Sequence, residues 1–256
     1  MSIIAVANQK GGVGKTTTAI NLGAALIERG RRVLIVDFDP QASATTALGI
    51  DPEGLETCIT HVMRAGIDDK PAPAIADIVT TVAGMDLAPS DISLSAIEAD
   101  LLTALGGEAI LRQILAPISD EYDYVLVDCL PGLGLLAINA LTAADQVLVP
   151  VQAEYLPMKG LRLLLQTVAK VRAKLNPNLE VAGILLTLVE MHTLHCREVC
   201  EHVRSVFEGR VRVFDTYIKK TVRLKETAVS GESILTYAPK HDAADAYRAL
   251  AAELEG

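Results

Sequence analysis

The chain has 256 residues, a formal net charge of −9, hydrophobic residues at 50% of positions, 4% aromatic residues and no tryptophan. This length suits one domain with a large core. A core of Ala, Val, Leu and Ile is typical of a parallel sheet covered by helices on both faces. The negative charge argues against a general attraction to nucleic acid. No apolar run is long enough to cross a bilayer and no signal-peptide pattern opens the chain, so we expect a cytoplasmic protein.

Apolar runs and helical patterns alternate along the chain. The expected strands are 3–8, 32–37, 85–88, 124–128, 146–151 and 181–188, the last of these being the last long strand. The expected helices are 16–29, a short one within 40–48, 93–105, 108–118, 133–144, 158–175, 197–207 and 243–254. The proline-containing segment 51–83 is the least regular, and we expect it to cover one edge. The order predicts a doubly wound, mostly parallel α/β sheet with helices on both faces, formed by 1–256 as a single domain.

A glycine-rich segment joins the first expected strand to the first expected helix. It reads Lys10-Gly11-Gly12-Val13-Gly14-Lys15-Thr16-Thr17. Glycines let the backbone wrap around a polyphosphate, and the N–H groups of the loop and of the helix N-terminus point at the anion. Lys15 is placed to reach the outer phosphates, and the Thr16 hydroxyl to hold Mg²⁺. The usual pattern has glycine six positions before Lys15, where this chain has Gln9, and a second lysine, Lys10, begins the loop.

Two further strands end in acidic residues. The second strand leads into Asp37-Phe38-Asp39-Pro40-Gln41, and the run 124–128 ends at Asp128. Because the carboxyl ends of parallel strands meet at one edge, these groups should converge on the phosphate loop. Asp128 suits a carboxylate that holds Mg²⁺ through water, with Asp37 sharing in that role. Asp39 is placed to orient the attacking water. The combination predicts hydrolysis of a nucleoside triphosphate.

Lys10 has little room to reach the outer phosphates of its own nucleotide. We hypothesise that it reaches the nucleotide of a partner subunit and neutralises charge in the transition state. The catalytic set is then Lys10, Lys15 and Asp39, and ATP holds together a two-fold homodimer that hydrolysis dissolves.

A basic segment lies near the C-terminal third of this acidic chain. It contains one acid, Asp215, and six basic residues, namely Arg210, Arg212, Lys219, Lys220, Arg223 and Lys225. A local basic patch on an acidic protein favours a polyanionic partner. A solvated, lysine-rich face is the alternative interpretation.

Four cysteines occur, and two of them are four residues apart on an expected helix. Cys196 and Cys200 would share a helix face near His192, His195 and His202. A metal site is one interpretation of this spacing. The other interpretation is that these are buried or partly exposed thiols in a reducing compartment, and the usual behaviour of cysteine in proteins favours it.

These motifs resemble the ParA/MinD family of deviant-Walker ATPases, and most closely its small chromosomal ParA (Soj) type. The matching runs are 8–18 with 21–22, 36–41, 128–129 with 134–136 and 139–141, 149–155, and 222–226. Three places depart from the family's pattern, one of which is the pair Ala228 and Val229 after Glu226, where the family commonly has prolines. Leu130 stands where the family commonly has proline, and Ile218-Lys219-Lys220 replaces the common Ile-Pro-Arg.

The resemblance implies an ATPase domain that uses ATP and Mg²⁺ and has no N-terminal helix-turn-helix extension. Its ATP-dependent homodimer would bind nonspecific double-stranded DNA, and a ParB-like activating protein would stimulate hydrolysis and release. Such a cycle segregates a chromosome or plasmid, or positions a protein cargo, with the ATP-bound form on the nucleoid. Arg223 matches a DNA-contact position of the family, and Lys219, Lys220 and Lys225 are plausible neighbours for phosphate contacts.

Two rival functions use the same fold. A MinD-like membrane-associated positioning ATPase needs a basic amphipathic C-terminal helix, whereas 243–256 is acidic and rich in alanine. We therefore expect this segment to dock on the body of the fold, without stable membrane association. A metal-cluster reductase or scaffold needs paired cysteines; Cys129 is suitably placed, but the chain has no Cys-x-x-Cys.

Overall fold

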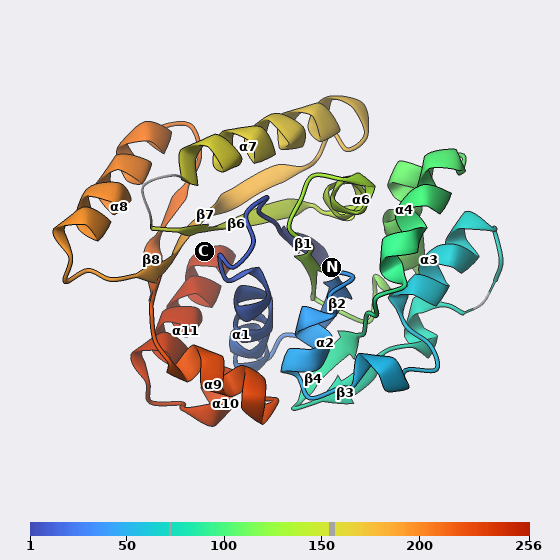
Figure 1. Cartoon of the computed structure of the whole chain (residues 1–256), viewed down its shortest axis with the longest axis horizontal. Helices are drawn as coiled ribbons and strands as arrows, with labels where there is room; N and C mark the ends of the chain where they lie inside the picture. The colour runs from blue at the N-terminus through green and yellow to red at the C-terminus, as the bar shows by residue number, and fades with distance from the viewer. Residues whose placement is uncertain (72, 154–156) are drawn as a thin grey trace.

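The computed structural model describes residues 1–71, 73–153 and 157–256, with side chains throughout except at 157–159, and over these residues it shows an eight-stranded sheet between layers of helices (Figure 1). The strands are β1 (Ser2–Val6), β2 (Val33–Phe38), β3 (Thr80–Val82), β4 (Met85–Ala88), β5 (Tyr124–Cys129), β6 (Gln146–Gln152), β7 (Glu180–Val189) and β8 (Val213–Lys219). The helices are α1 (Lys15–Glu28), α2 (Ser43–Ala47), α3 (Ile59–Ile67), α4 (Leu94–Thr103), α5 (Ile110–Leu115), α6 (Leu135–Ala143), α7 (Pro157–Lys174), α8 (Leu194–Phe207), α9 (Arg223–Ser230), α10 (Ile234–Tyr237) and α11 (Asp242–Glu255).

The strand order is β3-β4-β2-β5-β1-β6-β7-β8, and each neighbouring pair is parallel except β3 with β4. The predicted doubly wound, mostly parallel sheet is therefore confirmed. The chain order reverses around β1, which lies between β5 and β6. In open α/β sheets such a switch point, at the carboxyl ends of the strands, is where ligands bind.

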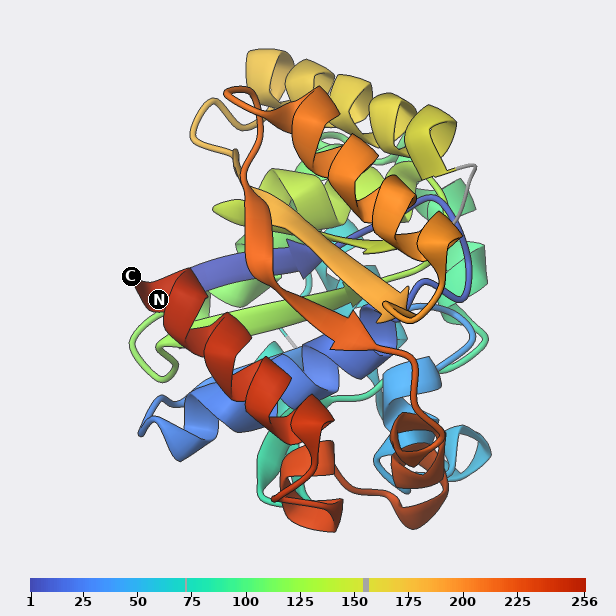
Figure 2. The ribbon, with the colours of Figure 1, turned by 90° about the vertical axis from the view of Figure 1, so that its left-hand side faces the viewer.

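Both faces of the sheet are buried because side chains alternate along each strand. Ile3 and Ala5 pack into the core beneath α3 to α8, whereas Ile4 and Val6 pack into the core beneath α1, α10 and α11. Figure 2 shows α7 and α8 on one side of the sheet, with α1 and α11 side by side on the other. Within the described residues, no helix combines the length and the apolarity of a membrane span.

Two expectations about the elements are wrong. The run 181–188 belongs to β7, but it is not the last long strand, because Val213–Lys219 adds the edge strand β8. The buried residues of β8 are separated by less buried and polar ones. The sequence therefore shows no continuous apolar run that would indicate a strand within the basic segment. The segment 51–83 is also more regular than expected: it contains α3, which packs on α4 and α5, and β3, which forms the opposite edge.

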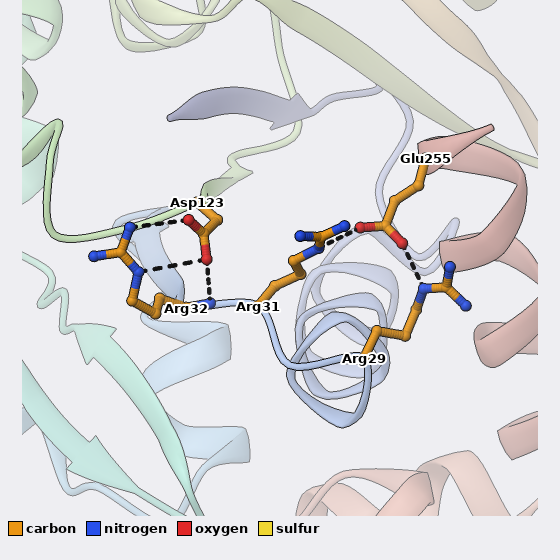
Figure 3. Close-up of polar contacts among 5 residues, drawn as sticks. All are labelled: Arg29, Arg31, Arg32, Asp123 and Glu255. Atoms are coloured by element: carbon orange, nitrogen blue, oxygen red, sulfur yellow. Dashed lines mark hydrogen bonds and ion pairs between the residues drawn. The ribbon is translucent and has the colours of Figure 1, made fainter.

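The C-terminal helix docks on the body of the fold, as predicted. Its buried residues, which include Tyr247 and Leu250, pack in the same core as α1. At its end Glu255 accepts hydrogen bonds from the Nε atoms of Arg29 and Arg31, just after α1 (Figure 3). Arg32 next to them pairs with Asp123 at 2.9 Å. Exposed ion pairs of this kind contribute little each, so the apolar contact with α1 holds α11.

Side chains from two helices form hydrogen bonds with backbone groups of the edge strand β8. These groups lie where the pairing of β8 with β7 shifts register. Glu253 of α11 accepts hydrogen bonds from the N–H groups of Asp215 at 3.0 Å and Thr216 at 2.8 Å. Arg204 of α8 donates to the carbonyl oxygens of Phe214 at 3.0 Å and Asp215 at 3.3 Å. Exposed edges can pair with other chains, so these contacts also protect the strand.

We expect Glu253→Ala to lower the free energy of unfolding by about 1 kcal/mol, because two backbone donors lose a charged acceptor. Urea unfolding measures this change. Glu198→Ala is the matched control, since it removes one exposed carboxylate of α8. Equal urea midpoints for the two variants would contradict the role given to Glu253.

Candidate functional site

A pocket of about 570 Å³ opens at the carboxyl ends of the strands. One end is lined by the phosphate loop and α1, through Gly12, Gly14, Lys15, Thr16 and Thr17. The other walls come from α2, from the end of β7 and from α9 with the segments around it. Residues far apart in the sequence thus enclose one space, large enough for a mononucleotide.

The phosphate loop has the backbone geometry that its glycines predict. Gly12 and Gly14 have φ values of 73° and 88°, in the left-handed region that side chains disfavour. The buried hydroxyl of Thr187, at the end of β7, donates to the carbonyl oxygen of Val13 at 2.8 Å. An ideal Cβ on Gly11 would lie 3.9 Å from Pro131, so the loop after β5 packs against the phosphate loop.

Lys15 is a buried cation at the start of α1, with only 6% of its surface exposed. Its ammonium donates to the carbonyl oxygen of Lys10 at 3.4 Å, across the loop. Burial lowers the pKa of Lys15, and the nearby Asp128, Cys129 and Asp39 oppose that change. Among the described residues, this long bond to a carbonyl is the one hydrogen bond of the Lys15 ammonium, so the buried cation is suited to bind a phosphate.

Two acidic strand ends meet in the centre of the sheet. The register between β2 and β5 places Asp37 beside Asp128, and Val6 pairs with Asp128 from the other side, directly before the phosphate loop. Both oxygens of Asp128 are buried and lack a hydrogen-bond partner among the described residues. The Thr16 hydroxyl lies near and lowers the pKa of Asp128, but burial and then Asp37 raise that pKa well above its usual range.

The chemistry of this donor set fits Mg²⁺. A buried carboxylate without a partner is costly unless a cation or a proton joins it. With Mg²⁺ bound, Asp128 and Thr16 would hold the ion beside the phosphates, and the ion would supply charge neutralisation. The role of Asp37 in this set stays a prediction, because one of its oxygens already accepts hydrogen bonds from Thr45 and the other accepts one from the N–H of Asp39.

Asp37 and Asp39 organise the loop that follows β2. Asp37 accepts from the N–H and the hydroxyl of Thr45 at 2.8 and 2.7 Å. Asp39 lies in the wall of the pocket, 7% exposed, and its carboxylate accepts from the N–H of Gln41 at 2.9 Å. The Ser90 hydroxyl donates to the carbonyl oxygen of Asp39 at 3.0 Å. The structure thus holds Asp39 in the wall of the pocket, and its role in orienting the attacking water stays a prediction.

Several residues of the site carry no local sequence signal. Thr45, Ser90 and Thr187 are single hydroxyl residues whose hydrogen bonds cross between strands and loops. Asn21 belongs to the family's opening signature, and the structure shows what it does. Its amide donates to the carbonyl oxygen of Thr17 at 2.7 Å and accepts from the N–H of Ile234 at 2.6 Å, which ties α1 to α10 beside the pocket.

Lys10 lies outside the pocket wall and is exposed. Its ammonium donates to the side-chain oxygen of Gln152, at the end of β6, at 3.0 Å. The Lys10 N–H donates to Asn8, which in turn donates to the carbonyl oxygen of Pro150 at 2.6 Å. The start of the loop is therefore fixed to β6. Glu154 and Tyr155, which complete the family-like run 149–155, lie outside the described residues.

The four predicted DNA-contact residues separate into two pairs. Lys220 and Lys225 line the nucleotide pocket, together with Leu224 and Thr227. Lys219 and Arg223 lie outside its wall. Three of the four are ion-paired within the chain: Lys219 with Asp242 at 2.8 Å, Lys220 with Glu190 at 3.1 Å and Arg223 with Glu226 at 2.8 Å.

The cysteines are free and buried. Cys196 accepts a hydrogen bond from the Glu190 N–H at 3.2 Å, and burial followed by the neighbouring Cys196 raises the pKa of Cys200 to about 11. The described residues contain no group of three or more His, Cys, Asp or Glu side chains that would hold a metal ion. The magnesium site at Asp128 differs from such a group, because phosphate and water would supply most of its ligands.

The buried carboxylates predict an unusual pH dependence. Burial raises the pKa of Asp37 from 3.8 to about 6, with Asp39 a smaller cause, and the pKa of Asp128 is raised further in the same direction. The folded chain therefore holds these protons more tightly than the unfolded chain. For Asp37 the associated stability is present below about pH 4 and is lost as the pH rises through about 6, and for Asp128 the loss extends to higher pH because its pKa is raised well above its usual range.

We expect Asp128→Asn to stabilise the nucleotide-free protein at pH 7.5, because it removes a buried carboxylate whose pKa is raised by burial, with the difference from wild type shrinking toward pH 5. Urea unfolding across this pH range measures the change. Magnesium and ADP together should stabilise the wild type more than the variant. Asp120→Asn, at an exposed position, is the control. A wild type and an Asp128→Asn variant with parallel pH profiles would contradict the assignment.

Comparisons with known proteins agree with this geometry. The AAA domain family matches residues 1–181. The sporulation initiation inhibitor protein Soj of Bacillus subtilis is 43% identical over 254 residues, covering 98% of this chain and 97% of Soj. The chromosome partitioning protein ParA of Caulobacter vibrioides is 40% identical over 257 residues, covering 99% of this chain and 94% of that protein.

A solved structure is similar along nearly the whole chain. It is described as cobyrinic acid a,c-diamide synthase from Mycobacterium smegmatis with bound ADP and magnesium, and it is 38% identical with a TM-score of 0.85. The similarity covers 98% of this chain and 93% of that one. Sequence identity over almost the full length, the sheet order and the phosphate loop agree: the chain belongs to the ParA/MinD family of ATPases and is Soj-like within it.

Proposed function

We propose that this chain is a ParA-type positioning ATPase of the cytoplasm. It hydrolyses ATP with Mg²⁺, its ATP-bound homodimer binds double-stranded DNA without sequence preference, and a ParB-like partner stimulates hydrolysis and release. The cargo is a chromosome, a plasmid or a protein assembly. The observation that carries the proposal is the buried, unpartnered carboxylate of Asp128 beside the phosphate loop and Lys15, in a chain 43% identical to Soj.

Each side chain has a role that follows from its position. Lys15 and the loop N–H groups bind the phosphates, which supports the assignment of the loop from Lys10 to Thr17 as the nucleotide site. Thr16 and Asp128, with Asp37 beside them, hold Mg²⁺. Asp39 orients the water that attacks the outer phosphate. Because the Thr45 and Ser90 hydroxyls fix the loop that carries Asp39, this loop is suited to respond to the γ-phosphate.

Lys10 supplies the link between ATP and dimerisation. Its exposed ammonium is held at the surface by Gln152 rather than directed into its own pocket. An ammonium at this place can leave Gln152 and reach the nucleotide of a facing subunit. The added cation stabilises charge on the transferring phosphoryl group. ATP with its γ-phosphate thereby favours the dimer, and hydrolysis removes the contact.

The surface of α11 gives the membrane alternative no support. The apolar face of this helix is buried against α1 and β8, and the segment is acidic. Anionic lipid would repel it. We therefore propose DNA, rather than a membrane, as the surface on which the ATP-bound form collects.

The first test is retention on nonspecific duplex DNA with ATP and Mg²⁺, with ADP and Mg²⁺, and without nucleotide, across a salt series. Retention should require ATP, weaken with salt and be lost in Lys15→Ala. Lys219→Ala/Arg223→Ala should lower the slope of log affinity against log salt by up to about 2. Arg64→Ala/Arg112→Ala is the control with the same charge change. No retention in any nucleotide state, despite ATP-dependent dimers, would exclude DNA as the surface.

The second test addresses Lys10. We expect Lys10→Ala to bind ATP as a monomer but to lose both the ATP-dependent dimer and most of the hydrolysis. Light scattering and phosphate release measure these. Gln152→Ala is the control, because it removes the hydrogen bond between Gln152 and Lys10 but keeps the cation, and it should still dimerise. A Lys10→Ala variant that dimerises and hydrolyses ATP as the wild type does would exclude the role across subunits.

A further inference from the structure

Helix α7 is the most one-sidedly charged element of this acidic chain. Residues 157–174 include five basic residues and no aspartate or glutamate, whereas the whole chain carries a net charge of −9. The remaining exposed helices of comparable length, α8 and α11, mix acidic with basic residues. A basic surface on an acidic protein indicates a specific anionic partner more strongly than a high overall charge does.

Three of the five basic residues of α7 form a stripe that winds slowly around the exposed side of the helix. Arg162, Gln166, Lys170 and Lys174 follow one another at intervals of four residues, which places them on one face of a helix, and all are exposed. The stripe spans about 18 Å from Arg162 to Lys174, at the rise of an α-helix. The opposite face, which includes Leu164 and Val168, is buried in the core.

The cations of the stripe differ from those of the basic segment in their partners. Arg162, Lys170 and Lys174 make no ion pair or side-chain hydrogen bond with any described residue, whereas Lys219, Lys220 and Arg223 are each paired with an acid of the chain. A phosphate that binds a paired cation must first displace a carboxylate. The stripe binds a phosphate without that cost, so its full charge is available.

Helix α7 also lies next to the nucleotide loop. An ideal Cβ on Gly160, in its first turn, would lie 4.0 Å from the side-chain oxygen of Gln9. Gln9 directly precedes Lys10, which Gln152 of β6 holds. Because Leu164 and Val168 of α7 are buried in the core, the stripe on the opposite face points away from the sheet. Figure 2 shows α7 beside α8 in the helical layer on that side of the sheet. The first turn of α7 thus lies beside Gln9 and Lys10, the part of the site that we expect to rearrange on dimerisation.

We propose that the α7 stripe, defined as Arg162, Lys170 and Lys174, binds the phosphate backbone of duplex DNA. This inference rests on the proposed function, and it places DNA contacts on a surface other than the basic segment. Duplex DNA carries one charge per about 1.7 Å of its axis, so an 18 Å stripe faces several phosphates at once. Membrane-surface helices combine cations with several large inserted apolar residues, whereas Ala169 and Ala173 border this stripe and Leu163 is the one large apolar residue of α7 that is exposed among the described residues, at 38%.

The experiment compares the wild type with two triple variants of the full chain, each of which removes three positive charges. Arg162→Ala/Lys170→Ala/Lys174→Ala removes the stripe. Arg64→Ala/Lys70→Ala/Arg112→Ala removes exposed cations of α3, α5 and the chain after α3, and it controls for net charge. The wild type and each variant are titrated with fluorescent nonspecific duplex DNA in ATP and Mg²⁺ between low and physiological salt. ATP-dependent dimerisation is measured alongside by light scattering.

The expected result is a loss of DNA affinity of about tenfold or more for the stripe variant, with the log affinity–log salt slope reduced by about 2 to 3. The control triple should keep the wild-type slope, and all three proteins should dimerise with ATP. Equal affinities and slopes for the two triples would overturn the inference while the wild type still binds DNA. A wild type that binds no DNA would overturn the proposed function itself.

A second arm uses vesicles of anionic phospholipid in place of DNA. The proposal expects no ATP-dependent flotation of the wild type. Flotation that the stripe variant loses, together with unchanged DNA binding by that variant, would overturn the assignment to DNA and give the stripe to a membrane surface.

Discussion

The site depends on two carboxylates that the sheet register forces together out of water. Asp37 and Asp128 are neighbours on β2 and β5, and β1 brings the phosphate loop alongside. Placing two buried acids in this way is unfavourable, as their raised pKa values indicate. The cost is offset when a divalent cation and a phosphate complete the site. Ligand binding and the stability of the sheet centre are therefore linked through the same atoms.

The pocket also brings together segments that are far apart in the sequence. Helix α2, which follows Asp39, packs against α9, and an ideal Cβ on Gly231 would lie 3.5 Å from the Cα of Gly49. Asn21 connects α1 with α10 beside the same space. The loop that carries Asp39, the wall that faces the nucleotide pocket and the basic segment are thus in contact. A change at the outer phosphate can reach the surface through packed elements rather than through a flexible linker.

A second constraint acts on the surface charge, because some of the basic side chains are paired with acidic residues of the same chain. The basic segment looks like the natural polyanion site when only its composition is known, yet Lys219, Lys220 and Arg223 each have an acidic partner. Exposed pairs of this kind are weak, so they restrain these cations without fixing them. The cations of α7 carry no such restraint among the described residues. The local attraction for phosphate therefore depends on whether the basic residues are already paired with acidic residues of the chain, as well as on the number of basic residues.

The sequence by itself determined the features that local patterns encode. The phosphate loop, the acidic strand ends and the central buried strands follow from glycine positions and from apolar periodicity, which act over a few residues. The edge strand β8 and helix α3 were not predicted, because polar residues and prolines interrupt those patterns. Only the tertiary structure decided that Lys220 and Lys225 line the nucleotide pocket and that Thr187 tethers the phosphate loop. Such contacts join residues distant in the chain, and their geometry is set by sheet order and packing, which no local pattern contains.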